Sequence, residues 1–194
     1  LPIRIEAPWG ATIPIEALEQ ELARSAPVKA LVLVHAETST GALQPLEDVG
    51  TLCRAHDALL IVDAVTSLGG IPVEVDTWGI DACYSGTQKC LSCPPGLAPL
   101  TVSPRGMGAI RQRRAPCHSW YLDLSLIADY WNDHSRAYHH TAPISMLYGL
   151  REALRLVHEE GLPARAARHQ INSDAMMAGL RTLGLNPLPP PGHR

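Results

Sequence analysis

The chain has 194 residues, of which 46% are hydrophobic, and a formal net charge of −3. A chain of this length buries roughly 70% of its unfolded surface, so it can build a core without disulfides or metal ions. The composition argues against disorder and offers no basic stripe for a nucleic acid, and no apolar run approaches the ~18 residues that suggest a membrane span.

The first half of the chain alternates predicted helices with predicted strands. Helices are expected over residues 14–24 and 45–58, and strands over residues 30–34, 59–62, 81–84 and 98–102. The runs at 30–34 and 59–62 are short and continuously apolar, which is typical of strands covered on both faces. This alternation predicts an α/β domain in which helices flank a mostly parallel sheet.

The second half of the chain is predicted to be helical. Helices are expected over residues 103–114, 124–131, 143–160 and 163–183. Ser103 and Pro104 are a favourable N-cap and first helical residue. Because Gly161 ends one helix and no strand follows, we expect residues 1–160 to be part of a large domain and residues 161–194 to be the truncated start of a small C-terminal domain.

The chain contains five cysteines, an odd number that favours free thiols in a reducing compartment over a disulfide framework. Cys90 and Cys93 have the spacing of redox and zinc motifs. No second ligand pair stands at a matching spacing, and Pro94 and Pro95 break the helix that a redox motif would begin. We therefore expect ordinary packing for these thiols and no metal site.

Polar residues follow three of the predicted strands, in the segments His35–Gly41, Asp63–Gly70 and Ser85–Cys90. Because ligands bind at the carboxyl ends of strands in open α/β sheets, we expect these segments to converge on one edge. Taken singly, Asp63 would be a turn residue and Lys89 a surface lysine. Together they suit pyridoxal phosphate, since an amine bonds its aldehyde and a carboxylate keeps its pyridine nitrogen protonated.

The motifs in these segments resemble those of a known family. Tyr84-Ser-Gly-Thr-Gln-Lys89, followed by Pro94-Pro95-Gly96, is similar to the Schiff-base segment of the class V, fold-type I aminotransferases. His35–Leu46, Val62–Gly70 and Tyr138–Thr141 match the same family in the same order. The likeness is closest to the alanine–glyoxylate (serine–pyruvate) aminotransferases. It implies the large domain of a pyridoxal-phosphate-dependent transferase with the aspartate aminotransferase-like fold, incomplete at both ends.

The resemblance also implies roles for individual residues. Lys89 would form the Schiff base with pyridoxal 5'-phosphate and move protons, and Asp63 would pair with the pyridine nitrogen. Val65 would pack on one face of the ring. Thr38 would contact the cofactor through its hydroxyl, and Gln88 would contact the phosphate.

Tyr138 and Thr141 match residues that reach the phosphate of the neighbouring subunit's cofactor, which implies a homodimer in the full-length protein. Thr141 precedes a predicted helix N-terminus, where anions are favoured, and a local cap is the alternative role. The implied reaction is transamination, in which alanine or serine passes its amino group to glyoxylate or pyruvate. Its partners would be these small amino acids and keto acids, inside the cell, in the cytoplasm or a peroxisome.

Other interpretations stay open at this point. The family's glycine-rich phosphate turn and substrate-binding arginine have no match here, so we expect an internal fragment of an aminotransferase. The alternative is a catalytically inactive fragment that acts only as a structural or dimerising piece. A serine–glyoxylate or aminoethylphosphonate aminotransferase would share these motifs. Gly106, Gly108 and Arg111 form a partial dinucleotide fingerprint of a dehydrogenase, with arginine where the third glycine belongs.

Overall fold

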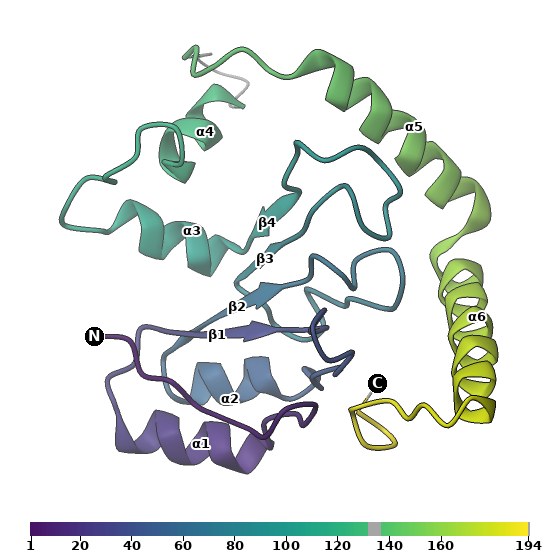
Figure 1. The fold of residues 1–194 in the computed structure, drawn as a ribbon. Helices are drawn as coiled ribbons and strands as arrows, with labels where there is room; N and C mark the ends of the chain where they lie inside the picture. The colour runs from purple at the N-terminus through teal and green to yellow at the C-terminus, as the bar shows by residue number, and fades with distance from the viewer. Residues whose placement is uncertain (132–136, 194) are drawn as a thin grey trace.

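The computed structural model describes residues 1–131 and 137–193 (Figure 1). In chain order its elements are α1 (Ile15–Arg24), β1 (Ala30–Val34), α2 (Val49–Ala55), β2 (Leu59–Asp63), β3 (Ala82–Tyr84), β4 (Leu100–Val102), α3 (Pro104–Arg111), α4 (Leu124–Tyr130), α5 (Ile144–Glu160) and α6 (Leu162–Thr182). Each overlaps its predicted position. The helix predicted over residues 45–58 is shorter than expected, and Asp57, whose φ is +53°, turns the chain out of the helical conformation just beyond it.

The strands of the described residues form one sheet in the order β1–β2–β3–β4. Neighbours β1, β2 and β3 run parallel, and β4 is antiparallel to β3. The mostly parallel sheet expected from the sequence is therefore confirmed. Because parallel strands share a carboxyl edge, the loops that follow β1, β2 and β3 emerge on the same side, where Figure 1 shows them between the sheet and the arc of α5 and α6.

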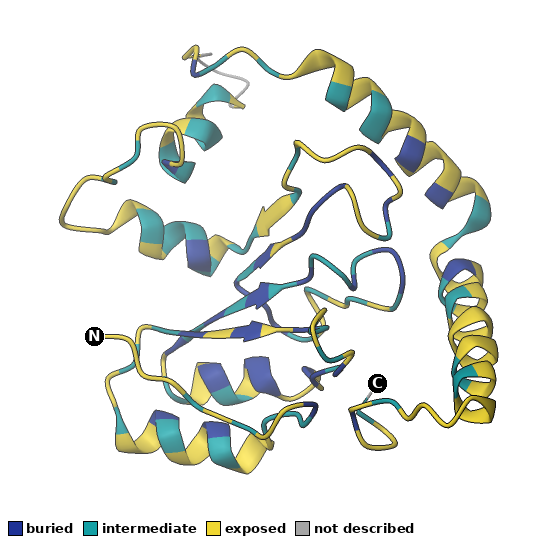
Figure 2. Cartoon of the chain, in the orientation of Figure 1, coloured by how far each residue is buried: buried dark blue, intermediate teal, exposed yellow. Residues whose placement is uncertain are grey.

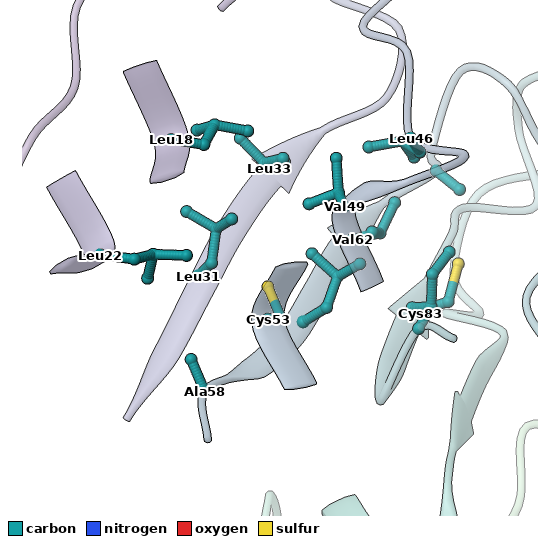
Figure 3. Close-up of a cluster of buried hydrophobic side chains, with 13 residues drawn as sticks. Leu18, Leu22, Leu31, Leu33, Leu46, Val49, Cys53, Ala58, Val62 and Cys83 are labelled. Atoms are coloured by element: carbon teal, nitrogen blue, oxygen red, sulfur yellow. The ribbon is translucent and has the colours of Figure 1, made fainter. Parts of the chain in front are cut away.

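Helices α1 and α2 cover one face of the sheet with a hydrophobic core. In Figure 3, Leu18 lies beside Leu33 and Leu22 beside Leu31, and Cys53 continues the cluster from α2. These side chains come from the inward positions of α1, β1 and α2, which recur at helical and strand spacing. Their burial is the main apolar contribution that holds the first half of the chain together.

The opposite face of β1 is open. Val32 is 60% exposed and Val34 is 42% exposed, and Figure 2 shows buried and exposed residues alternating along the strand. The prediction that this strand is covered on both faces is therefore wrong for the described residues, because α1 and α2 both pack on the other side. Asp63 pairs in register with Val34 and lies on the open face.

A buried carboxylate joins the sheet to α3. Asp81 is 4% exposed and accepts hydrogen bonds from the backbone N–H of Leu60 and the hydroxyl of Ser103, both at 2.9 Å. The Arg105 guanidinium adds an ion pair at 2.8 Å. Ser103 also caps α3, as predicted, by accepting from the Gly106 N–H. A Cβ on Gly106 would lie 2.8 Å from the Asp81 carbonyl oxygen, so glycine lets α3 approach the sheet.

Helices α5 and α6 form an arc around the carboxyl edge of the sheet (Figure 1). Gly161, with a φ of +80°, separates them. Helix α5 buries Ala153 and Val157, whereas α6 is exposed along most of its length (Figure 2) and buries a single residue, Arg165. Among the described residues, no helix has both the length and the apolar character needed to cross a bilayer.

Candidate active site

Asp63 is the last residue of β2 and lies half-buried at the carboxyl edge. The backbone N–H of Val65 donates to its Oδ1 at 2.9 Å, and the Tyr84 hydroxyl donates to its Oδ2 at 2.7 Å. Tyr84 ends β3 opposite Asp63 in the parallel register, so the two side chains share a face of the sheet. An ionised carboxylate offers about four acceptor positions, so these two donors leave room for a third.

The hydrogen bond from Tyr84 to Asp63 raises the pKa of Tyr84, because the neutral phenol donates and a phenolate would be repelled by the carboxylate. Its contribution to stability is complete below pH ~10, the usual tyrosine value, and is lost as the pH rises through the raised pKa of the folded state. In an alkaline titration followed by tyrosinate absorbance, we expect one tyrosine to ionise above the usual tyrosine pKa, and Tyr84→Phe should remove this ionisation. Asp63→Ala should move it to lower pH, and an unchanged titration in this variant would contradict the contact.

Lys89 lies in the loop that follows β3, at the same edge as Asp63, and its side chain is exposed. The loop around it is tightly held. Thr87 is fully buried, and its hydroxyl donates to the Pro94 carbonyl at 2.7 Å. The carbonyl of Thr87 in turn accepts from the Cys93 N–H at 3.0 Å. These bonds hold the backbone on both sides of Lys89 while its amine stays accessible.

The other residues predicted to contact a cofactor in the same subunit lie in the neighbouring loops. Val65 is half-buried in the loop after β2, and Thr38 is exposed in the loop after β1. Gln88 is exposed beside Lys89. A Cβ on Gly86 would lie 2.8 Å from the Gln88 amide, so glycine at this position leaves space for that side chain.

Tyr138 and Thr141 form a separate pair ahead of α5, with their hydroxyl oxygens 2.8 Å apart. Tyr138 is 74% exposed, whereas its neighbour His139 is buried and stacks on Trp120 with 4.1 Å between ring centroids. His139 thereby anchors the segment that presents the two hydroxyls. Figure 1 places this segment apart from the loops that follow β1, β2 and β3. The predicted contribution of this pair to a neighbouring subunit's site stays a prediction.

Known proteins match the chain over nearly all of its length. Residues 5–189 match the family model described as Aminotransferase class-V. The chain belongs to the class V aminotransferase family. It is 43% identical to the (S)-ureidoglycine–glyoxylate transaminase of Bacillus subtilis (strain 168), over 93% of this chain and 47% of that protein. It is 40% identical to the alanine–glyoxylate aminotransferase of Oryctolagus cuniculus, over 91% of this chain and 45% of that protein.

Comparison of the fold with solved structures identifies the same family. The solved structure of alanine–glyoxylate aminotransferase from Nostoc sp. matches this chain with a TM-score of 0.90 at 49% identity, covering 94% of this chain and 48% of that one. The chain spans about half the length of the curated relatives it matches. Family membership confirms the resemblance found in the sequence and rules against the dehydrogenase interpretation. Gly106 and Gly108 lie inside α3 rather than in the turn before a helix where a dinucleotide fingerprint acts.

The residues at the carboxyl edge fit pyridoxal phosphate, the cofactor that this aminotransferase family implies. The Asp63 carboxylate can take one more donor, such as a protonated pyridine nitrogen, and the Lys89 amine is accessible. Thr38 and Gln88 add polar groups from the adjoining loops. The contact of Tyr84 with Asp63 is a feature that sequence reasoning missed, although the alternation of side chains along paired strands could have found it.

Proposed function

We propose that this aminotransferase chain forms part of a pyridoxal-phosphate-dependent enzyme that passes the amino group of alanine or serine to glyoxylate or pyruvate. The observation that carries the proposal is the placement of Asp63 and Lys89 after neighbouring parallel strands of a class V chain. Glyoxylate as acceptor is supported by the names of the Bacillus subtilis and Nostoc relatives, both of which include it.

In this proposal each side chain has its own task. Pyridoxal phosphate, when bound, supplies a ring that draws electrons from the α-carbon of the substrate. Asp63 would accept a hydrogen bond from the ring nitrogen, and its charge would favour the protonated form of that nitrogen. Lys89 holds the cofactor through its amine, then takes the α-proton of the substrate and returns it. Val65 would pack on one face of the ring, Thr38 would contact the cofactor through its hydroxyl, and Gln88 would contact the phosphate.

The proposal extends to the second half of the chain. Residues 1–160 would belong to the large domain, and residues 161–194 would begin a smaller one. Tyr138 and Thr141 would present their hydroxyls to the phosphate in a second subunit's site, so the whole enzyme would be a homodimer. If the isolated chain is inactive but co-elutes with the intact enzyme in size-exclusion chromatography, it acts as a dimerising piece instead.

The two lysines of the chain provide an internal control for this proposal. Lys29 is exposed at the amino end of β1, the edge of the sheet opposite the carboxyl edge. We expect pyridoxal phosphate at roughly stoichiometric concentration, followed by borohydride reduction and peptide mass spectrometry, to modify Lys89 about tenfold faster than Lys29, because the proposed cofactor site includes Lys89 and not Lys29. Lys29→Arg should keep the adduct and Lys89→Arg should lose it. Equal modification of both lysines would refute the assignment.

Substrate choice is tested separately in the whole enzyme. Alanine, serine and aminoethylphosphonate are offered as donors, with glyoxylate and pyruvate as acceptors, and keto-acid and aldehyde products are measured. We expect alanine or serine with glyoxylate or pyruvate to turn over fastest. A preference for aminoethylphosphonate would reassign the donor and leave the roles of Asp63 and Lys89 intact.

A further inference from the structure

Arg165 is the one residue that α6 buries, although this helix has 21 residues. The Arg165 side chain reaches away from its own helix to three acceptors. Its Nη1 donates to Glu160 Oε2 at 2.8 Å, its Nε donates to the Gly69 carbonyl at 2.8 Å, and its Nη2 donates to the Cys90 carbonyl at 2.5 Å. A helix that is otherwise exposed is thus attached at this point to the carboxyl edge of the sheet.

The two backbone acceptors belong to the two loops that carry the proposed chemistry. Gly69 lies in the loop after β2, which begins at Asp63, and Cys90 directly follows Lys89. These loops also touch each other, because the Cys90 thiol donates to the Thr66 carbonyl at 3.4 Å. The planar guanidinium of Arg165 spans both carbonyls at once, a geometry that the single ammonium of a lysine cannot reproduce.

Holding α6 in place does not by itself require this arginine. A buried charge is costly unless it is paired and hydrogen-bonded, and an apolar side chain of similar volume often stabilises a fold as well or better. An apolar side chain in place of Arg165 would find apolar neighbours, since Leu68, Leu91 and Leu162 line the adjacent pocket. Hydrogen bonds from Arg168 and then from Arg165 lower the pKa of Glu160 to about 2, so its carboxylate stays charged. What the arginine adds over an apolar residue is a defined position for two carbonyl groups.

We propose that Arg165 is a positioning residue, which sets the backbone at Cys90 against the loop after β2 and so aims the amine of Lys89. The inference rests on the proposed function of Lys89 and adds to it a residue from the second half of the chain. A misplacement of about 1 Å can lower the rate of a positioned group by up to ~10²-fold, so losing the guanidinium should slow the reaction of Lys89 without unfolding the chain.

The test compares Arg165→Ala and Arg165→Lys with the parent chain in the lysine modification experiment. We expect both variants to modify Lys89 about tenfold more slowly or worse, while Lys29 in the same molecules reacts at the parent rate. Guanidinium chloride at a concentration well below denaturing levels should restore the rate in Arg165→Ala, and sodium chloride at the same ionic strength should not. A loss of packing alone would not be reversed by the free ion.

Arg168→Ala is the matched control, because Arg168 lies on the same helix, also bonds Glu160 and is half exposed. In this variant Lys89 should be modified at the parent rate.

If the parent chain does not favour modification of Lys89 over Lys29, the proposed function fails. If the parent favours Lys89 but folded Arg165→Lys keeps the parent rate, or folded Arg165→Ala is not restored by guanidinium, the positioning role is overturned. Circular dichroism establishes folding, and Arg165→Lys decides the matter if the alanine variant does not fold.

Discussion

Replacing Asp81 with alanine is expected to lower the free energy of unfolding by about 3–5 kcal/mol. The Asp81 carboxylate is buried and joins Leu60 of β2, the Ser103 cap of α3 and the Arg105 guanidinium. Its removal leaves the buried Leu60 N–H without its acceptor and takes from Arg105, whose side chain is 33% exposed, the closer of its two carboxylate partners. Urea unfolding followed by circular dichroism measures the loss as a lower midpoint with an unchanged slope.

Asp57 provides the matched control for this experiment, because its carboxylate faces the same guanidinium at 3.5 Å but is fully exposed to solvent. Asparagine tolerates the positive φ at this position, so Asp57→Asn removes the charge without straining the backbone. We expect no measurable change in stability, since exposed ion pairs contribute little. A similar loss in both variants would mean that Arg105 needs nearby negative charge rather than the buried hydrogen-bonded contact with Asp81.

Local patterns predicted the elements that carry the candidate site. The strands β1 and β2 were found from short, continuous apolar runs, and Asp63 was placed at the end of β2 for the same reason. The helix predicted over residues 45–58 was too long at both ends. Helix α2 begins only at Val49, and just beyond its C-terminus Asp57 takes a left-handed conformation that apolar spacing cannot anticipate. The covering of β1 on both faces was also mispredicted. A continuous apolar run shows that both faces of a strand can be buried. Which faces are covered depends on where the helices of the fold pack, and α1 and α2 pack on the same face.

Contacts between distant residues were beyond what a local pattern predicts. Arg165 bonds the carbonyls of Gly69 and Cys90, which lie 96 and 75 residues away in the sequence. In a helix with many polar residues, an arginine is normally taken for a solvated side chain. The contact of Tyr84 with Asp63 was easier to predict. Both residues end neighbouring strands, and side chains that alternate along paired strands place them on the same face of the sheet. The register of predicted strands is enough to place Tyr84 beside Asp63, whereas no predicted register relates Arg165 to Gly69 or Cys90.

Replacing Asp63 with asparagine is expected to lower turnover of the whole enzyme by about 10²–10³-fold, the usual cost of removing one positioned electrostatic group. Asparagine has nearly the same shape, and its oxygen can still accept from one of the two donors, the Val65 N–H or the Tyr84 hydroxyl. The main loss is therefore the negative charge at the carboxyl end of β2. Without it, a ring nitrogen at this position holds its proton less strongly, and the α-carbon of the substrate releases its proton more slowly.

Asp76→Asn is the control for the change in net charge, because Asp76 is exposed in the connection between β2 and β3. Its turnover should equal that of the parent. In the proposed role, the charge of Asp63 acts mainly while the α-proton of the substrate is leaving, so its loss should lower kcat with little change in KM. A variant Asp63→Asn that kept parent turnover would contradict the proposed role, whereas equal losses in both variants would trace the effect to overall charge. A loss confined to Asp63→Asn and to kcat ties the reaction to this carboxylate.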